Sequence, residues 1–240
     1  MAQRVRLYVD QPLAAGQSLD LAADQAHYLF AVMRLTEGAQ LGLFNGRDGG
    51  EWEAVVAETG KRKGRLNVLF EAAPPQPRPD LWLLFAPLKK ARTDMLVEKA
   101  TELGATRLQP VATDYTNAER VREDRLAAIA REAAEQSGAT SVPEVSGLEK
   151  LSALLDGWDP ARELWFCDEM RAEDPAVPEA PAEGPGAILI GPEGGFSPAE
   201  RERLRALPFC RPVALGRRIL RAETAAISAL TLWLAARGFP

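Results

Sequence analysis

A proline-rich run divides the sequence into two segments with different residue patterns. Four prolines occur within residues 73–79. Proline fixes φ and lacks a backbone donor, so such a run continues neither a helix nor a central strand. A stiff linker is the expected conformation. We therefore predict an N-terminal domain over residues 1–72, a linker over residues 73–79 and a second domain over residues 80–240.

The first segment contains several short strand patterns. The turn-forming sequence Asn-Gly-Arg-Asp-Gly-Gly at residues 45–50 separates two apolar runs and predicts a strand pair. Asp24 is a candidate N-cap for a helix that carries His27. Strands are expected at residues 6–9, 41–44, 52–56 and 66–70. A small β-barrel with one helix fits this pattern.

The second segment alternates between strand and helix patterns. Its first run, residues 81–85, is continuously apolar, as strands buried on both faces of a parallel sheet are. Further strands are expected at residues 108–111, 163–167, 187–190 and 212–215, helices at residues 93–103 and 118–137, and an exposed proline-rich loop at residues 173–186. This alternation predicts an α/β fold in which helices cover both faces of a mostly parallel sheet.

The net charge gives no indication of a nucleic-acid partner, whereas local clusters of basic residues favour one. The formal net charge is -5 and the pI is about 5.2. Basic clusters occur at residues 61–65, 89–92 and 217–221. Each cluster alone is typical of a solvated face. Because all three lie beside a turn or a strand end, together they favour a phosphate-contacting surface.

The remaining composition limits the chemistry. There are two cysteines and one histidine, so we expect no metal site and no disulfide framework. A histidine-based triad would need His27. No apolar run reaches membrane-spanning length and no signal-peptide pattern opens the chain. A soluble, cytoplasmic protein that does not enter a membrane is the expectation.

Residues 187–223 carry the pattern most typical of a ligand site. An apolar run leads into a loop with three glycines at residues 191–195, and Ser197, Pro198 and Glu200 then form a helix-start signature. Ligands of α/β sheets bind beyond the carboxyl ends of strands, although an ordinary strand–helix loop would give the same pattern. No P-loop and no GxGxxG sequence is present, which disfavours a Rossmann-type cofactor site. The alanine-rich final helix is open to two interpretations, a dimer seam or a helix packed on its own sheet.

Two motifs in this stretch resemble a known family. IGPEGGFSPAE at residues 190–200 and LGRRILRAETAAISAL at residues 215–230 are similar to sequences of the RsmE family of 16S rRNA (uracil-N3) methyltransferases, which belong to the SPOUT superfamily. Residues 27–35, 88–104, 132–137 and 142–143 support the resemblance, which extends over nearly the whole chain. The chain departs from the family pattern at Gly138-Ala139, where the family often has Gly-Arg, and in the less basic segment of residues 114–117.

The resemblance implies a fold and a methyl donor. The second domain would be a SPOUT α/β-knot with a deep trefoil knot, and the first a PUA-like RNA-binding β-barrel. S-adenosylmethionine would lie in the knot, in contact with two turns. The implied donor-binding residues are Leu189, Ile190, Gly191, Pro192, Glu193, Gly194, Leu215, Gly216, Ile219 and Leu220.

The implied reaction is methyl transfer to N3 of a uridine in 16S rRNA of the small ribosomal subunit. Since neutral uracil N3 carries a proton, charge on the base must be stabilised and the proton must be accepted. Arg221 is the candidate for the first role, and Glu193 or Glu223 for the second. A plain salt bridge between Arg221 and Glu223 is the alternative interpretation.

RNA contacts are expected from basic residues of both domains, and a homodimer through the SPOUT domain is implied. The candidate RNA-binding residues are Arg4, Arg6, Arg34, Lys61, Arg62, Lys63, Arg65, Lys89, Lys90 and Arg92. Two other functions fit less well: ribose 2′-O-methylation by a SPOUT enzyme, and a non-catalytic RNA-binding assembly factor.

Overall fold

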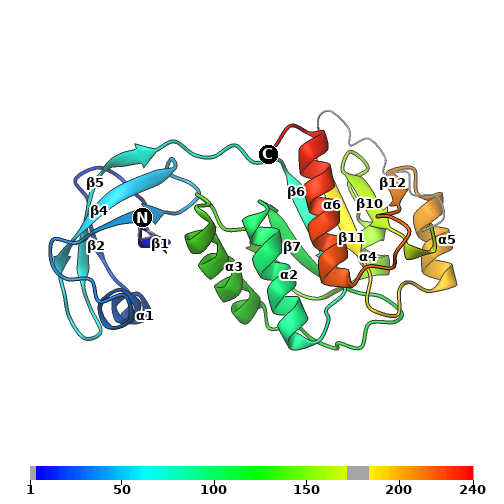
Figure 1. Ribbon diagram of the computed structural model, residues 1–240, viewed down its shortest axis with the longest axis horizontal. Coiled ribbons are helices and arrows are strands. Elements are labelled where there is room, and N and C mark those ends of the chain that lie inside the picture. Colours follow the sequence, from blue (N-terminus) through cyan, green and yellow to red (C-terminus); the bar gives the residue numbers. More distant parts are fainter. Residues whose placement is uncertain (1–3, 172–183, 240) are drawn as a thin grey trace. The chain divides into compact units, whose positions relative to one another are not determined.

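The computed structural model describes residues 4–171 and 184–239, and it separates into two compact units (Figure 1). The first unit comprises the chain up to Pro77 together with Ala134–Val142, and the second comprises the rest. The division after Pro77 falls within the proline-rich segment. The return of Ala134–Val142 to the first unit has no counterpart in the sequence patterns. The loop expected at residues 173–186 lies mostly outside the described residues.

The first unit is a five-stranded sheet with one short helix. Its strands are ordered β1-β3-β4-β5-β2, and all neighbours are antiparallel except β1 and β3. The strands are β1 (Arg6–Tyr8), β2 (Ser18–Asp20), β3 (Gln40–Phe44), β4 (Glu51–Glu58) and β5 (Arg65–Ala73). The expected turn at residues 45–50 joins β3 to β4. Alternate apolar residues such as Leu41, Leu43 and Leu66 are fully buried and form its core.

The helix of this unit does not begin where the sequence pattern predicts. Helix α1 (Ala23–His27) continues as a π-helical turn, η1 (Tyr28–Val32). Asp24 lies in the first turn and is not the N-cap. The N-cap position belongs to Ala22, whose backbone N–H donates to Oε1 of Gln25 at 3.1 Å. The Gln25 side chain thus accepts a hydrogen bond at the start of the helix, where we expected Asp24 to be the N-cap.

The second unit is built on a parallel sheet ordered β12-β10-β11-β6-β7-β8, with β9 pairing β7. Its strands are β6 (Leu81–Phe85), β7 (Arg107–Ala112), β8 (Glu144–Val145), β9 (Glu149–Lys150), β10 (Glu163–Cys167), β11 (Gly186–Ile190) and β12 (Cys210–Val213). Its helices are α2 (Lys90–Glu102), α3 (Glu123–Ser137), α4 (Leu151–Asp156), α5 (Pro198–Ala206) and α6 (Ala222–Ala236). The α/β class, the mostly parallel sheet and the β-rich N-terminal unit are thereby confirmed. The trefoil knot that the resemblance implies stays a prediction.

Several element boundaries differ from the sequence pattern. The strand expected at residues 212–215 lies two residues earlier, as β12, and the helix expected from residue 118 begins at Glu123. Strands β8 and β9 and helix α4 had no prediction because segments of two to six residues are too short to carry a clear hydrophobic period.

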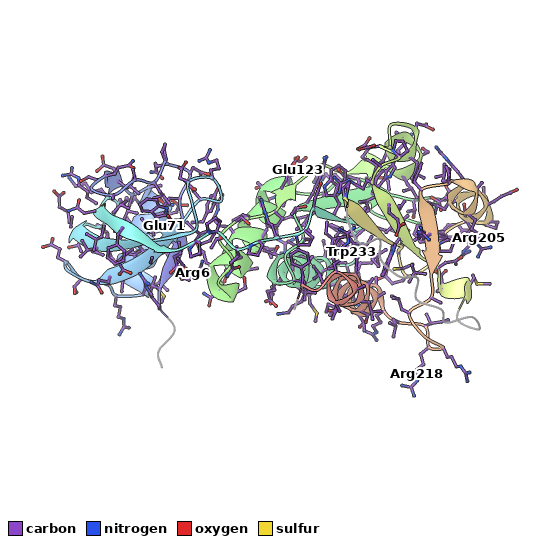
Figure 2. The ribbon with its side chains drawn as sticks, turned by 90° about the horizontal axis from the view of Figure 1, so that it is seen from above. Arg6, Glu71, Glu123, Arg205, Arg218 and Trp233 are labelled. Atoms are coloured by element: carbon purple, nitrogen blue, oxygen red, sulfur yellow. The ribbon has the colours of Figure 1, made fainter. Side chains whose placement is uncertain are left out.

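Helices cover both faces of the sheet. Helices α2 and α6 lie side by side on one face (Figure 1). Trp233 of α6 is fully buried against Gly186 of β11, where a Cβ would come within 2.4 Å of the indole (Figure 2). Leu151 and Leu155 of α4 and Leu204 of α5 belong to the apolar cluster of the other face. The alanine-rich final helix therefore packs on its own sheet.

All neighbouring strands of this sheet run parallel, so their carboxyl ends lie along one edge. Loops that are far apart in the sequence are brought together there, which is how such sheets build ligand sites. None of the helices among the described residues is long and apolar enough to cross a bilayer.

Candidate active site

A cavity of about 340 Å³ lies at the carboxyl ends of three neighbouring strands, β12, β10 and β11. Its size falls in the range of small-molecule sites. The lining comes from the segments that follow these strands and from the start of α6. The lining residues are Cys167, Asp168, Glu169, Ile190, Gly191, Pro192, Glu193, Gly194, Gly195, Val213, Ala214, Leu215, Gly216, Arg218, Ile219, Leu220, Arg221, Ala222 and Ala225.

The loop after β11 is fixed at both ends. At its start, a Cβ on Gly191 would come within 2.6 Å of the Phe196 ring, so only glycine fits against this buried side chain. At its end, Ser197 accepts from the Glu200 N–H while Glu200 accepts from the Ser197 N–H, the capping box that the sequence predicts. The Ser197 hydroxyl also donates to Oδ2 of Asp114. A defined loop backbone therefore faces the cavity.

The loop after β12 forms the opposite wall and is more open. Gly216 has φ of +117°, which side-chain-bearing residues rarely adopt, and nothing lies within 4 Å of a Cβ placed there. Ile219 is 79% exposed although it lines the cavity. The Arg218 side chain extends away from the ribbon into solvent (Figure 2).

The structure brings the expected donor-binding residues to one cavity, with one exception. All line it except Leu189, which is fully buried in the apolar cluster that also holds Phe166 and Phe196. Because successive residues of a strand point to opposite faces, Leu189 points into this cluster while Ile190 reaches the cavity. We therefore leave Leu189 out of the donor contacts proposed below.

Sequence reasoning missed the third wall, which follows β10. Asp168 is buried and forms ion pairs with Arg201 and Arg205 of α5. Glu169 pairs with Arg201. The only available indication was their position directly after a predicted strand. Burial, reinforced by the charge of Glu169, raises the pKa of the neighbouring Cys167 thiol to about 12, which disfavours its thiolate at neutral pH.

Two of the three catalytic candidates, Glu193 and Glu223, lie beside Arg92, a residue that we expected to contact RNA. Its Nη1 lies 3.4 Å from Oε1 of Glu193, and its Nε lies 3.8 Å from Oε1 of Glu223. Glu223 is buried, and its Oε2 has no hydrogen-bond partner among the described residues.

Arg221 is exposed, lines the cavity at the start of α6, and makes no ion pair within the described parts of the chain. The alternative of a salt bridge between Arg221 and Glu223 is therefore not what the structure contains; Arg92 occupies that role. Within the described residues, the Arg221 guanidinium is thus available at the cavity wall.

The basic residues of the first unit fall into two groups. Lys61, Arg62, Lys63 and Arg34 are exposed and have no ion-pair partner among residues 4–171 and 184–239. Arg65 is paired with exposed carboxylates, and Arg4 is paired with the largely buried carboxylates of Glu51 and Glu53.

Arg6 is instead a structural residue. It is buried, forms an ion pair with Glu51, and donates to the backbone oxygens of Ala134, Glu135 and Ala139. These contacts occupy its guanidinium, so we leave Arg6 out of the RNA contacts proposed below. They also explain why Ala134–Val142 belongs to the first unit.

In the second unit, Lys89, Lys90 and Arg92 lie at the start of α2. Lys89 and Lys90 are exposed, whereas Arg92 is half-buried. No group of three or more His, Cys, Asp and Glu side chains suited to a metal ion occurs in the described portion.

Comparison with known proteins identifies both units. Residues 74–234 match the sequence model of an RNA methyltransferase domain, and residues 21–69 match that of an RNA methyltransferase PUA domain. The Ribosomal RNA small subunit methyltransferase E of Rickettsia conorii is 31% identical over 94% of this chain and 93% of its own. The Mycobacterium bovis protein of the same name is 32% identical over 93% of this chain and 88% of its own.

Solved structures agree with the sequence comparison. The Ribosomal RNA small subunit methyltransferase E of Neisseria gonorrhoeae, bound to S-adenosyl methionine, superposes with a TM-score of 0.87 at 26% identity and covers 97% of this chain and 98% of its own. A Legionella pneumophila protein in complex with the same cofactor gives a TM-score of 0.85 at 27% identity over 98% of both chains. Since the match extends over both units, this chain belongs to the RsmE family of RNA methyltransferases.

Proposed function

We propose that this protein transfers the methyl group of S-adenosylmethionine to N3 of a specific uridine in 16S rRNA of the small ribosomal subunit. The observation that carries the proposal is the glycine-walled cavity beyond β10, β11 and β12. Two structural relatives that share the fold over nearly their whole length were solved with this donor bound.

The residues of the cavity fit such a donor. Ile190, Leu215 and Leu220 offer apolar contact to an adenine ring, and the glycines let backbone groups approach its edge. Glu169 supplies a carboxylate that can accept hydrogen bonds from ribose hydroxyls or an ammonium group. The donor supplies an electrophilic methyl group on a sulfonium. The remaining donor contacts that we propose are Gly191, Pro192, Glu193, Gly194, Gly216 and Ile219.

The chain's own residues supply what N3 methylation requires. Arg221 is free to stabilise negative charge on a uracil carbonyl oxygen. Glu193 and Glu223 are the carboxylates close enough to Arg92 to belong to the same cluster, and one of them accepts the N3 proton. Holding the methyl group and N3 in line removes much of the entropic barrier.

RNA is held by both domains, whose boundaries we propose as residues 1–72, 73–79 and 80–240. Lys61, Arg62, Lys63 and Arg34 form the exposed cationic part of the PUA-like domain, supported by Arg4 and Arg65, and Lys89, Lys90 and Arg92 lie beside the active site. Phosphate contacts of this kind position the RNA without reading its sequence.

We also propose a homodimer through the second domain, in the cytoplasm. Ile219 is 79% exposed beside the donor cavity, and Met95 of α2 and Leu232 of α6 are exposed apolar residues. A second copy covering this region would remove them from water and close the open wall of the cavity. Two free cysteines suit a reducing compartment.

The test separates three functions. Calorimetry with S-adenosylmethionine distinguishes an enzyme from a non-catalytic assembly factor, because only the enzyme needs a donor site. Small subunits isolated from cells that lack the enzyme are then incubated with the protein and the donor, and the nucleosides are analysed by mass spectrometry. We expect N3-methyluridine; a methylated ribose instead would establish the 2′-O specificity and overturn the proposal.

A further inference from the structure

A second cavity of about 550 Å³ lies beside the donor cavity. Three loops line it, and they follow β6, β7 and β11, which are adjacent in the sheet. Its lining residues are Pro87, Leu88, Lys89, Arg92, Asn117, Ala118, Pro192 and Glu193. The donor cavity lies at the ends of β12, β10 and β11, so the two cavities meet at the loop after β11.

Pro192 and Glu193 line both cavities. A group bound in the second cavity therefore lies next to the donor, and this one loop contacts both. Glu223, the other candidate proton acceptor, lines neither cavity and is buried behind Arg92. Because Glu193 lines both cavities and Glu223 lines neither, the shared wall favours Glu193 as the proton acceptor.

The second cavity combines apolar walls with a few polar groups. Pro87, Leu88 and Ala118 provide apolar surface suited to a flat ring. Arg92 reaches Glu193 and Glu223 through Nη1 and Nε, which leaves further guanidinium N–H groups able to donate to a ligand. Asn117 adds an amide that can donate or accept, and Lys89 adds a second cation.

We propose that this second cavity receives the flipped-out uracil, with the Glu193 carboxylate facing N3–H. The inference rests on the proposed N3 methylation and names its acceptor subsite. Uracil presents an acceptor, a donor and an acceptor along O2, N3–H and O4. Glu193 supplies the central acceptor, and Arg92, Asn117 and Lys89 supply donors to one flanking oxygen. The other oxygen is left to Arg221, which lines the neighbouring donor cavity.

The same arrangement rejects cytosine. Cytosine N3 is an unprotonated acceptor and its N4 is a donor, so its lone pair would face the Glu193 carboxylate and its amino group would face a cation. Such mismatched polar contacts are a strong source of discrimination.

In the chemical step, the N3–H bond breaks and its proton passes to Glu193. N3 bonds to the methyl carbon as the bond from carbon to sulfur breaks, and the electron pair stays on sulfur. The products are N3-methyluridine and neutral S-adenosylhomocysteine, and Glu193 returns its proton to solvent. Glu223 holds Arg92 in place and is a positioning residue.

The first experiment fills the cavity. Ala118→Phe places a ring in the second cavity, whereas Ala199→Phe makes the same change at an exposed position of α5 that lines neither cavity. With isolated small subunits and labelled donor, we expect Ala118→Phe to lower kcat/KM at least about 100-fold and Ala199→Phe to leave it unchanged. Donor affinity, measured by calorimetry, should stay within about threefold of the original in both. Full activity in Ala118→Phe overturns the assignment.

The second experiment measures the preference for uridine over cytidine at the methylated position. The methylated uridine is mapped by mass spectrometry, and subunits carrying cytidine there are prepared. We expect the original protein to prefer uridine at least about 100-fold. Glu193→Gln should lower uridine methylation about 100-fold and reduce the uridine-to-cytidine ratio at least tenfold, because its amide can donate to cytosine N3.

An unchanged ratio in Glu193→Gln would overturn the pairing of Glu193 with N3 while leaving the methyltransferase assignment intact. Absence of N3-methyluridine with the original protein would instead refute the proposed function itself. The two failures are therefore distinguishable.

Discussion

At the scale of single residues, the site depends on which charged groups are already engaged. Arg92, Glu193 and Glu223 form one cluster, whereas Arg221 has no ion-pair partner in the described part of the chain. A cation that keeps its donors free at a cavity wall can stabilise charge that develops only during reaction. We therefore expect Arg221 to affect the chemical step more than donor binding.

Replacing Arg221 by alanine should lower kcat about 100- to 1,000-fold, the usual cost of removing one such donor. Donor affinity, measured by calorimetry, should change less than about threefold. Arg217→Ala is the matched control, since Arg217 is exposed nearby but does not line the cavity. Equal losses in the two variants would show that charge in this segment, and not contact with the base, governs the rate.

Gly216 tests the donor wall at the same scale. Gly216→Ala forces a side-chain-bearing residue to a φ of +117° and should cost about 1–2 kcal/mol of local strain. We expect the β12 loop to shift and donor affinity to fall at least about tenfold, measured by calorimetry, with a single cooperative unfolding transition retained.

Gly104→Ala provides the comparison for Gly216→Ala. Its φ is +83° and its Cβ space is likewise empty, but it lies at the end of α2 and does not line the donor cavity. Backbone strain alone should leave its donor affinity unchanged. If both variants bind the donor normally, the β12 loop is not a donor wall.

At the scale of elements, the two edges of the parallel sheet have different roles. Both cavities lie at the carboxyl edge. Before the first residues of β6 and β10, at the amino edge, Asp80 pairs with buried Arg162 at 2.6 Å, and Arg162 also donates to the Gly186 carbonyl and stacks on Trp82. This pair joins the starts of three strands without approaching the ligand sites.

The Asp80 pair makes stability depend on pH. Burial alone would raise the pKa of Asp80, but the hydrogen bonds and charge of Arg162 outweigh it and lower that pKa below its usual 3.8. Its stabilising contribution is therefore present above the unfolded-state pKa and is lost as pH falls through the lower, folded-state pKa. Asp80→Asn should lower the Tm at pH 7, and the difference from the original protein should shrink below about pH 4.

Thermal unfolding between pH 3 and 7 measures the effect of Asp80→Asn. Asp156→Asn is the control, because that carboxylate is 74% exposed in its pair with Arg203 and should matter little at any pH. A Tm difference for Asp80→Asn that stays constant over this pH range would assign its effect to packing instead of charge. Donor affinity at pH 7 should be unchanged in both variants.

At the scale of the whole molecule, the net charge does not indicate where RNA can bind. The chain carries a charge of -5, yet Lys61, Arg62 and Lys63 are exposed cations without ion-pair partners in the residues described. Phosphate binding depends on such local groups. It weakens as the salt concentration rises, because binding releases counterions from the RNA. Unpaired cations, and not the overall field, should set the affinity for RNA.

Replacing Lys61, Arg62 and Lys63 together by alanine should weaken binding to small-subunit RNA. The slope of log K against log salt should become shallower by about 2–3, since each lost phosphate contact removes about 0.7–0.9. Lys99→Ala is the control, because the hydrogen bonds that Lys99 donates to Glu102 and Glu98 raise its pKa to about 12 and keep it paired. An unchanged slope in the triple variant would exclude this loop from the RNA contact.

How far the sequence predicted this molecule depended on the range of the interactions involved. The capping box of Ser197 and Glu200 and the buried strand after Gly186 follow from local rules, and both were predictable. The engagement of Arg6 with Ala134 and Ala139 joins residues more than 120 positions apart, and no local pattern encodes it. The Arg92 cluster and the Asp168 wall arise in the same way, from loops that meet only once the sheet forms.

The loop after β11 has a thermodynamic consequence. Since Pro192 and Glu193 belong to both cavities, the shape that one ligand imposes on this loop is the shape that the other ligand encounters. If the donor and the uracil bind as we propose, the two binding free energies are coupled and the coupling is reciprocal. RNA then changes the affinity for the donor by the same factor as the donor changes the affinity for RNA. The loop after β11 would then be the part of the chain through which binding of the donor and binding of RNA influence each other.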